Sequence, residues 1–353
     1  MLVFLILALL PVFFGIRVAK PGQFFPDYLA KTQTAAMGGV FVLLVFLSHA
    51  STYVSLQGPL DAAYSAFQGY LRQLVVAPFL FYSGYGMLES IKQKGMDYVR
   101  HIPTRRFAKV LLHMEIAVLL FLLTDLAIGR QPGPKKVMLA FTFWESIGNS
   151  NWYIFVILSL YLLVFFSFLL CRGRLFAGTA LTTVLAAGYV YLLVRAGKDM
   201  WCTTLALYPL GMWVSLLRPQ LEKLVTKHDL CWLVCIGALA VPYHLCRLRS
   251  GTHLAWYTLW SALFMALLVL LTMKIKTGNR VLQWLGAHVF SIYILQRIPM
   301  MVLRRLGLAD HRYLFILLSF LATLALAVLF DAALAKLDAR IWRPRSEGKV
   351  EPR

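Results

Sequence analysis

One histidine lies in an otherwise apolar stretch of the chain. His49 follows the run Gly39-Val-Phe-Val-Leu-Leu-Val-Phe-Leu-Ser48, in which no side chain is charged, and it stands about fourteen residues, or about 20 Å, into an apolar segment. A neutral imidazole can accept a proton from a hydroxyl group, so His49 is a candidate general base. The alternative is a structural histidine that hydrogen-bonds to a neighbouring helix, which is the more common role of a single buried histidine.

A second stretch combines small residues with a basic cluster that follows it. The segment Phe79-Leu-Phe-Tyr-Ser-Gly-Tyr-Gly-Met87 has Ser83 and Gly84 at its centre, and Arg105, Arg106 and Lys109 come after it. Small residues let helices pack closely, and they would also let a ligand lie along the helix. Cations beside the start of a helix are suited to a phosphorylated ligand. The alternative is that these cations only direct membrane topology.

Other titratable side chains also occur in apolar segments, where they are costly and therefore candidates for function. They are His113, Glu115, Asp125, His244, His288, Arg297 and Asp331. Asp331 and His244 lie near the ends of their segments, where an interfacial role accounts for them. The five cysteines form no CxxC pair and have no His or Asp at ligand spacing, so we expect no metal site.

The elements that position these residues must be membrane helices. Of the 353 residues, 60% are hydrophobic and only 14% are charged, and the net charge is +20. A soluble domain has about 25% charged residues. The composition excludes an ordinary soluble enzyme, a disordered chain and a secreted disulfide scaffold, and it predicts an all-α, polytopic transmembrane bundle. The basic residues form short clusters between apolar segments, which membrane topology requires, so we expect no nucleic-acid partner.

About eleven segments approach the length of about 20 residues that a membrane helix needs. They are 1–16, 35–55, 73–91, 107–129, 152–170, 175–194, 201–217, 229–246, 254–273, 282–303 and 313–335. We therefore divide the chain into an N-terminal helix and loop (1–34), a membrane core (35–340) and a basic tail (341–353). Asn149, Ser150 and Asn151 are predicted to cap the helix that begins at residue 152. Segment 138–148 is too short to span, and we expect an amphipathic or re-entrant piece there.

The distribution of Lys and Arg predicts the orientation. With the N-terminus outside, 23 of the 35 basic residues fall on the cytoplasmic side and 12 on the outer side. Short loops with more Lys and Arg stay in the cytoplasm. We therefore expect a multi-pass protein of the plasma (inner) membrane with its N-terminus outside and its C-terminal tail in the cytoplasm.

Several stretches, taken together and in order, resemble the acyltransferase 3 family of integral membrane acyltransferases. They are the run that ends at His49, Phe81-Tyr-Ser-Gly-Tyr-Gly-Met87, Arg105-Arg-Phe-Ala-Lys109, Asn149-Ser-Asn-Trp-Tyr-Ile154 and Leu285-Gly-Ala-His-Val-Phe-Ser-Ile-Tyr-Ile-Leu-Gln-Arg-Ile-Pro299. Each stretch alone is weak, because apolar helices look alike. Their order and spacing over nearly the whole chain make the resemblance specific.

The resemblance implies a ten-helix acyltransferase core, preceded here by one extra helix. It implies that an acyl group, usually acetyl, passes from a cytoplasmic coenzyme A thioester to a hydroxyl, often on a sugar of a cell-surface or exported molecule. The family's essential histidine matches His49, and its basic motif matches Arg105, Arg106 and, more loosely, Lys109. Neither the motifs nor the cysteine spacing implies a metal.

The expected site follows from this resemblance. A thioester is already activated, so the protein must orient the reactants, remove a proton and stabilise an oxyanion. His49 would be the general base. The donor-binding candidates are Arg105, Arg106, Lys109, Ser83 and Gly84, and the acceptor-side candidates are Trp152, Tyr153, Gln296 and Arg297.

One position departs from the family pattern. The family usually has Arg or Lys eleven residues before the histidine, and this chain has Gly38 there. A protein that keeps the acyltransferase shape without its activity is therefore one alternative. Another is a proton-coupled transporter of a small polar molecule, with His49, Glu115, Asp125 and His288 as a relay. The absence of an internal repeat argues against the transporter.

Overall fold

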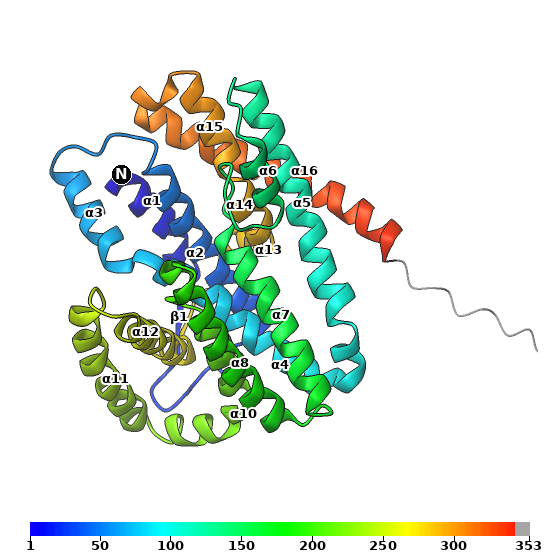
Figure 1. Cartoon of the computed structure of the whole chain (residues 1–353). Helices are drawn as coiled ribbons and strands as arrows, with labels where there is room; N and C mark the ends of the chain where they lie inside the picture. The colour runs from blue at the N-terminus through cyan, green and yellow to red at the C-terminus, as the bar shows by residue number, and fades with distance from the viewer. Residues whose placement is uncertain (343–353) are drawn as a thin grey trace, which may run out of the picture.

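The apolar segments form long helices that pack side by side into one bundle (Figure 1). The computed structural model describes residues 1–342. The first half contains α1 (Leu2–Phe13), β1 (Arg17–Val18), α2 (Lys31–Ala50), α3 (Pro59–Leu71), η1 (Arg72–Val76), α4 (Ala77–Arg100), η2 (Pro103–Ala108), α5 (Lys109–Ala127), α6 (Pro134–Phe141) and α7 (Trp152–Leu170). The second half contains α8 (Leu175–Arg195), α9 (Asp199–Cys202), α10 (Leu207–Val225), α11 (Asp229–Arg249), α12 (Leu254–Lys274), β2 (Ile275–Lys276), α13 (Arg280–Ala287), α14 (Val289–Leu295), α15 (Arg297–Arg305), η3 (Leu308–Asp310) and α16 (Arg312–Ile341).

The predicted all-α membrane bundle is confirmed. Within the described residues, nine helical stretches are long and apolar enough to cross a membrane, and a tenth is the bent pair of Arg280–Ala287 and Val289–Arg305. The two parts of this pair meet at an angle of 62° at His288. Predicted segment 1–16 differs from expectation, because α1 has only 12 residues. At 1.5 Å per residue it is about 18 Å long, shorter than the bilayer core of about 30 Å.

Glycines set the closest helix contacts. A Cβ atom at Gly39 on α2 would lie 2.1 Å from the carbonyl oxygen of Leu282 on α13, and one at Gly286 on α13 would lie 1.8 Å from that of Ala35 on α2. On α4, a Cβ at Gly84 would lie 1.9 Å from the carbonyl oxygen of Tyr208 on α10. Only residues without a side chain allow backbones to approach so closely. These contacts fix the face that α2 turns toward α13 and the face that α4 turns toward α10.

Loops that the predicted topology places on the same side of the membrane contact one another. Strand β1 pairs with β2 in antiparallel register, Arg17 with Lys276 and Val18 with Ile275. The Gly22 amide donates to Asp229 (2.8 Å). All these segments were assigned to the cytoplasmic side. On the side assigned to the exterior, Asp61 and Arg312 form an ion pair. The loops group as expected, and which group faces the cytoplasm remains a prediction.

Two local predictions need correction, and one lies outside the described residues. Asn151 precedes α7 but does not cap it with its side chain, which instead donates to the carbonyl oxygen of Phe143 (2.8 Å). Asn149 accepts from the Ile147 amide (3.0 Å), so both side chains stabilise the loop rather than the helix. Segment 138–148 is not one helix: α6 ends at Phe141 and irregular chain follows. The predicted tail, 341–353, lies outside the described residues beyond position 342.

Candidate functional site

His49 lies at the end of α2, as its second-last residue. The neighbouring ring is that of Tyr293 on α14, with centroids 6.4 Å apart. The residue as a whole is partly exposed, but its Nδ1 atom is buried and has no hydrogen-bond partner within residues 1–342. Buried polar atoms are nearly always paired in folded proteins. An unpaired imidazole nitrogen is therefore a group whose partner is expected to be water or a substrate.

More buried polar atoms that have no partner among residues 1–342 lie on the segments next to Tyr293 and in the loop that Arg297 contacts. Gln296 donates from Nε2 to the carbonyl oxygen of Tyr293 (3.0 Å), which leaves its buried Oε1 atom without a partner in the described chain. The Nε atom of Arg297 and the Nδ2 atom of Asn149 are likewise buried without partners there. Arg297 contacts the loop of Asn149 through the carbonyl oxygen of Gly148 (3.4 Å). We call His49, Asn149, Gln296 and Arg297 the polar chamber.

Two of the aromatic candidates extend the chamber toward α4. The ring of Tyr153 lies 5.5 Å from that of Tyr293 and 6.4 Å from that of Phe79. Trp152 packs edge-on against Tyr153, with centroids 6.0 Å apart. Tyr293 therefore lies between His49 and Tyr153, and Trp152 packs against Tyr153 from the preceding position, the first of α7.

A cavity of about 640 Å³ opens at the other end of α2. Its walls come from residues 26–34, the inner half of α4, Tyr98, Arg106, Tyr161 and Arg218. Three of the lining residues are cations, namely Lys31, Arg106 and Arg218, and two are carboxylates, Asp27 and Glu89. Arg106 donates to the Tyr98 hydroxyl (2.9 Å), and Arg218 donates to the Tyr85 hydroxyl (3.0 Å) and pairs with Glu222 (2.6 Å). We call this space the basic cavity.

Only some of the predicted donor-binding residues line the basic cavity. Ser83 and Arg106 do. Gly84 is buried against α10 and does not line it. Arg105 is exposed outside it, and Lys109 forms an ion pair with Asp338 on α16 (2.6 Å). The basic motif thus splits, because successive residues of the η2 turn point in different directions.

Sequence reasoning missed two cations of this cavity. Lys31 lies 18 residues before His49, and at 100° per residue this spacing returns to the same helix face. That periodicity was present in the sequence and could have identified Lys31. Arg218 gave no comparable signal. It reaches the cavity because α10 packs against α4, and it also donates to the carbonyl oxygen of Pro26 (2.9 Å).

One face of each of two helices runs from the basic cavity toward His49. On α2 this face contains Lys31, Gly38 and His49. On α4 it contains Phe79, Tyr82, Gly86, Ser90 and Gln93, at spacings of three and four. A Cβ atom at Gly38 would lie 3.9 Å from the Phe79 ring, so the two faces meet there. The distance from Lys31 to His49 along the axis is about 27 Å.

Several of the other titratable groups of the apolar segments pair with partners away from His49, whereas the buried Oε2 atom of Glu115 has no partner in residues 1–342. His288 and Ser291 hydrogen-bond to Asp331, and His113 to Asp338 (2.9 Å). Asp125 pairs with Arg130 (3.2 Å). Within the described residues, no hydrogen bond joins any two of the groups considered as a proton relay. Residues 1–342 also contain no group of three His, Cys, Asp or Glu side chains that could hold a metal ion.

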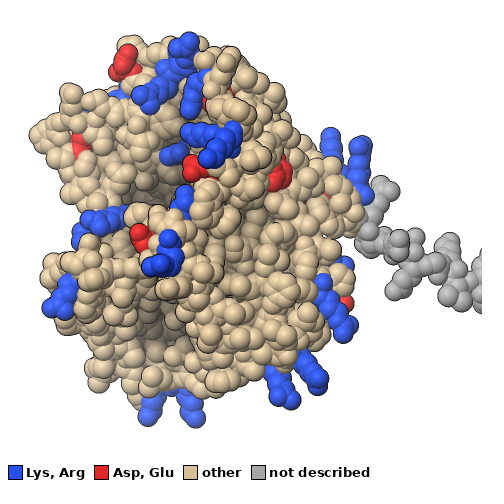
Figure 2. Space-filling view, viewed as in Figure 1, with Lys and Arg blue, Asp and Glu red and all other residues tan. Residues whose placement is uncertain are grey.

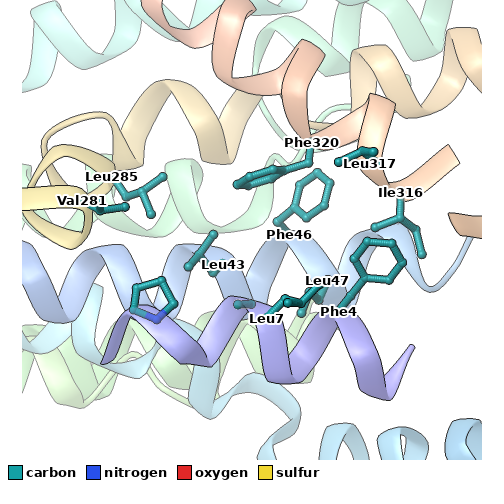
Figure 3. A pocket seen from close by; sticks show the side chains of 12 residues that line it. Phe4, Leu7, Leu43, Phe46, Leu47, Val281, Leu285, Ile316, Leu317 and Phe320 are labelled. Carbon is teal, nitrogen blue, oxygen red and sulfur yellow. The ribbon is translucent and has the colours of Figure 1, made fainter. Parts of the chain in front are cut away.

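Another cavity differs in chemistry from the basic cavity. It has a volume of about 290 Å³ and lies between α1, α2, α13 and α16 (Figure 3). All its lining residues are apolar, among them Leu7, Phe46 and Phe320. It offers no donor to a phosphate, so it is not a candidate for the nucleotide end of a coenzyme.

Comparison with known protein families identifies the family of the chain. Searches of curated proteins and of solved structures gave no match. The family of membrane acyltransferases described as "Acyltransferase domain" (acyltransferase 3) matches residues 37–332, which is most of the chain and includes His49, Arg106 and the polar chamber. The chain belongs to the acyltransferase 3 family.

Proposed function

We propose that this membrane acyltransferase moves an acyl group, in the first instance acetyl, from acyl-coenzyme A to a hydroxyl group, with His49 as the general base. The acceptor is a sugar of a cell-surface or exported molecule. The observation that supports this most is the unpaired Nδ1 atom of His49, at the end of the faces that lead from the basic cavity. Donor binding at the cytoplasmic side and a plasma-membrane location belong to the same proposal.

The donor's phosphates bind in the basic cavity. Lys31, Arg106 and Arg218 surround a space of about 640 Å³. Charge-assisted hydrogen bonds to phosphate are stronger than neutral ones, and Arg gives bidentate contacts. The pantetheine arm then lies along α4 past Ser83, so that the thioester reaches the polar chamber.

Lys31 takes the role of the cation that the family usually has at position 38. The two positions are seven residues apart on one face of α2, about 10 Å along the axis. Lys31 lines the basic cavity, and its side chain is exposed there. The cation therefore lies at position 31 instead of position 38, and the presence of Gly38 does not by itself remove the donor site.

The chemistry requires one proton transfer in each direction. His49 removes the proton of the acceptor hydroxyl, whose oxygen attacks the thioester carbonyl. Arg297 stabilises the resulting oxyanion. The tetrahedral intermediate then breaks its carbon–sulfur bond, and the imidazolium returns the proton to the coenzyme A thiolate. The products are the acyl ester and free coenzyme A.

Purified protein in lipid nanodiscs with labelled acetyl-coenzyme A tests the proposal. Release of free coenzyme A, or transfer of label, that depends on His49 would support it. Flux of a polar solute into proteoliposomes without consumption of donor would contradict it and favour transport.

A further inference from the structure

The cavity between α1, α2, α13 and α16, which we call the apolar cavity, opens on the surface of the bundle. Three of its lining side chains are about half exposed, namely Leu7 (53%), Val281 (57%) and Leu317 (47%). Phe46 and Leu285, which also line it, are buried. Figure 2 shows that Lys and Arg gather in separate groups over the face drawn, with broad uncharged areas between them. In a membrane-spanning bundle, an opening among exposed apolar side chains faces lipid chains.

The size of the apolar cavity suits a hydrocarbon ligand. Its volume is about 290 Å³, and all its lining residues are apolar. Protein interiors have few voids larger than a water molecule, because the atoms around a void lose dispersion contacts. An apolar cavity of about 150 Å³ stays free of water and binds benzene, which has six carbon atoms. By that measure the apolar cavity has room for about twelve carbon atoms, which is most of one lipid chain.

The length of the apolar cavity fits a chain from one leaflet. Figure 3 shows Val281 at one end and Phe4 and Ile316 at the other. Along α1 the lining extends from Phe4 to Pro11, which is about 10 Å at 1.5 Å per residue. One leaflet contributes half of the bilayer core, about 15 Å. A chain that enters at the Pro11 end therefore fills the cavity without crossing the middle of the bilayer, and its head group stays outside that end.

One side chain joins α1 to α13 at the Pro11 end. The Nδ2 atom of Asn279 donates to the carbonyl oxygens of Phe14 (3.0 Å) and Pro11, and its Oδ1 atom accepts from the Leu282 amide (2.9 Å). Asn279 therefore caps α13 and holds the end of α1 beside it. Because both helices are fixed at this junction, the end of the apolar cavity keeps its shape when no ligand is bound.

Two arginines lie at this junction. Arg280 is the first residue of α13 and the neighbour of Val281, which lines the apolar cavity. Arg17 follows α1 and lies opposite Lys276 in the β1–β2 pair. Both arginines are exposed, and neither side chain makes a hydrogen bond or ion pair within residues 1–342. Their charges are available to an anion at the Pro11 end.

At the Phe4 end, the nearby cation is already paired. Tyr313 packs against Phe4, with ring centroids 5.8 Å apart, and it follows Arg312 in the chain. Arg312 forms an ion pair with the buried carboxylate of Asp61. An anionic head group at this end would have to compete with that carboxylate. The difference in charge between the two ends therefore places the head group at the Pro11 end.

We propose that the apolar cavity holds one acyl chain of an anionic phospholipid, whose head-group phosphate binds Arg17 and Arg280. Arginine makes bidentate contacts to phosphate. Four of the twelve lining residues come from α1, which precedes the residues 37–332 that match the family. The site thus depends on a helix outside the matched region, and the bound chain stabilises the contact of that helix with α2. The inference goes beyond acyl transfer and does not depend on it.

Photolabelling of the full-length protein in nanodiscs tests the proposal. The nanodiscs contain phosphatidylcholine and a small amount of phosphatidylglycerol that has a photoreactive diazirine on one acyl chain. After irradiation, mass spectrometry locates the label. The reference is α11, a membrane helix whose side chains are mostly exposed. We expect label on residues 4–11 and 281–285 several times above that on α11. Unlabelled phosphatidylglycerol should displace this label, and phosphatidylcholine should not.

Variants that occupy the apolar cavity test the position of the chain. Ala8→Phe fills the cavity, and Leu7→Trp covers its open side, so each should abolish the label on residues 281–285. If Ala8→Phe fails to fold, Leu7→Trp still gives the answer, because Leu7 lies at the exposed edge. The matched control is Val184→Trp, which adds bulk at an exposed position of α8 away from the cavity.

Variants that remove charge test the head group. The double variant Arg17→Gln/Arg280→Gln should weaken the binding of phosphatidylglycerol by about tenfold or more, because each cation near the surface attracts anionic lipid. The control is Arg174→Gln/Lys227→Gln, which removes two other exposed cations from loops assigned to the same side. Both double variants change the net charge equally, so an effect of charge on membrane topology would appear in both.

Three outcomes would overturn the proposal. One is label spread equally over α1 and α11, which would show only the lipid that surrounds any membrane protein. Another is label on residues 281–285 that persists in Leu7→Trp. The last is equal displacement by the two phospholipids, or equal binding by the two double variants. Thermal unfolding of each variant checks the fold. No acyl transfer is measured, so these outcomes are independent of His49 and of coenzyme A.

Discussion

The polar groups near the two ends of α2 differ in whether they have hydrogen-bond partners. At the Lys31 end, Arg106 and Arg218 are held by tyrosine hydroxyls around an open cavity. At the His49 end, the buried Nδ1 atom of His49, Oε1 atom of Gln296 and Nε atom of Arg297 have no partners in residues 1–342. Solvated, oriented cations bind a phosphorylated molecule without much change in the protein. Unpaired buried groups instead cost free energy until a substrate satisfies them.

This difference separates binding from chemistry along a single helix. Changes at the Lys31 end should alter donor affinity and its dependence on salt. Changes at the His49 end should alter the rate and leave donor affinity intact. The predictions below test that separation, from the largest expected effect to the smallest.

Replacement of His49 should have the largest effect. We expect His49→Ala and His49→Gln to lower acyl transfer by about 10²–10⁴-fold, because neither side chain can exchange a proton near neutral pH. Coenzyme A binding and thermal unfolding should stay near the wild-type values. An active Gln variant, with an Ala variant that unfolds at lower temperature, would make His49 a structural residue.

Loss of cations from the basic cavity should come next. Each charge-assisted phosphate contact contributes about 1.5–3 kcal/mol, so Arg106→Ala and Lys31→Ala should each weaken coenzyme A binding by at least tenfold. Isothermal calorimetry at two salt concentrations measures this, and the loss should shrink at high salt. Arg105→Ala is the matched control, since Arg105 lies outside the cavity. Equal effects of Arg105 and Arg106 would contradict the assignment.

Two glycines on α4 have different surroundings: Gly84 packs against α10, and Gly86 lines the basic cavity. A Cβ atom at Gly84 would lie 1.9 Å from the Tyr208 carbonyl oxygen, whereas one at Gly86 would meet nothing within 4 Å. Overpacking costs about 1–3 kcal/mol, so Gly84→Ala should lower the unfolding temperature and the yield. Gly86→Ala should unfold like the wild type. Similar stability of both variants would show that α4 and α10 are further apart than described.

The smallest effect concerns the loop that forms one wall of the basic cavity. The hydrogen bond from Lys276 lowers the pKa of Asp27, which lies outside the membrane-spanning segments. Because the pKa of Asp27 is lowered, the contact stabilises the loop fully at pH values above the unfolded-state pKa of about 3.9. This stabilisation is lost as the pH falls through the lowered pKa of the folded state. Hydrogen exchange of residues 19–30, corrected for intrinsic rates, should rise at low pH. Asp27→Asn should remove this pH dependence, and an unchanged profile would contradict the contact's role.

The sequence predicts those parts of the site that depend on the residues of a single helix. His49 is identified by its apolar surroundings, and Lys31 is identifiable from helical periodicity. The donor candidates were less certain, because a residue's role on a helix surface depends on which neighbour covers it. Gly84 and Ser83 are adjacent, yet one packs against α10 and the other lines the cavity.

The sequence by itself determined the class of molecule, the family and the approximate spans. Hydropathy decides which segments enter a bilayer, and the hydropathy of a segment follows from its own residues alone. Only the tertiary structure decided which cations share a cavity, that Lys109 pairs with Asp338, and that an apolar cavity lies between α1, α2, α13 and α16. The physical reason is that insertion depends on the composition of one segment, whereas cavities depend on how several helices are rotated and packed against one another.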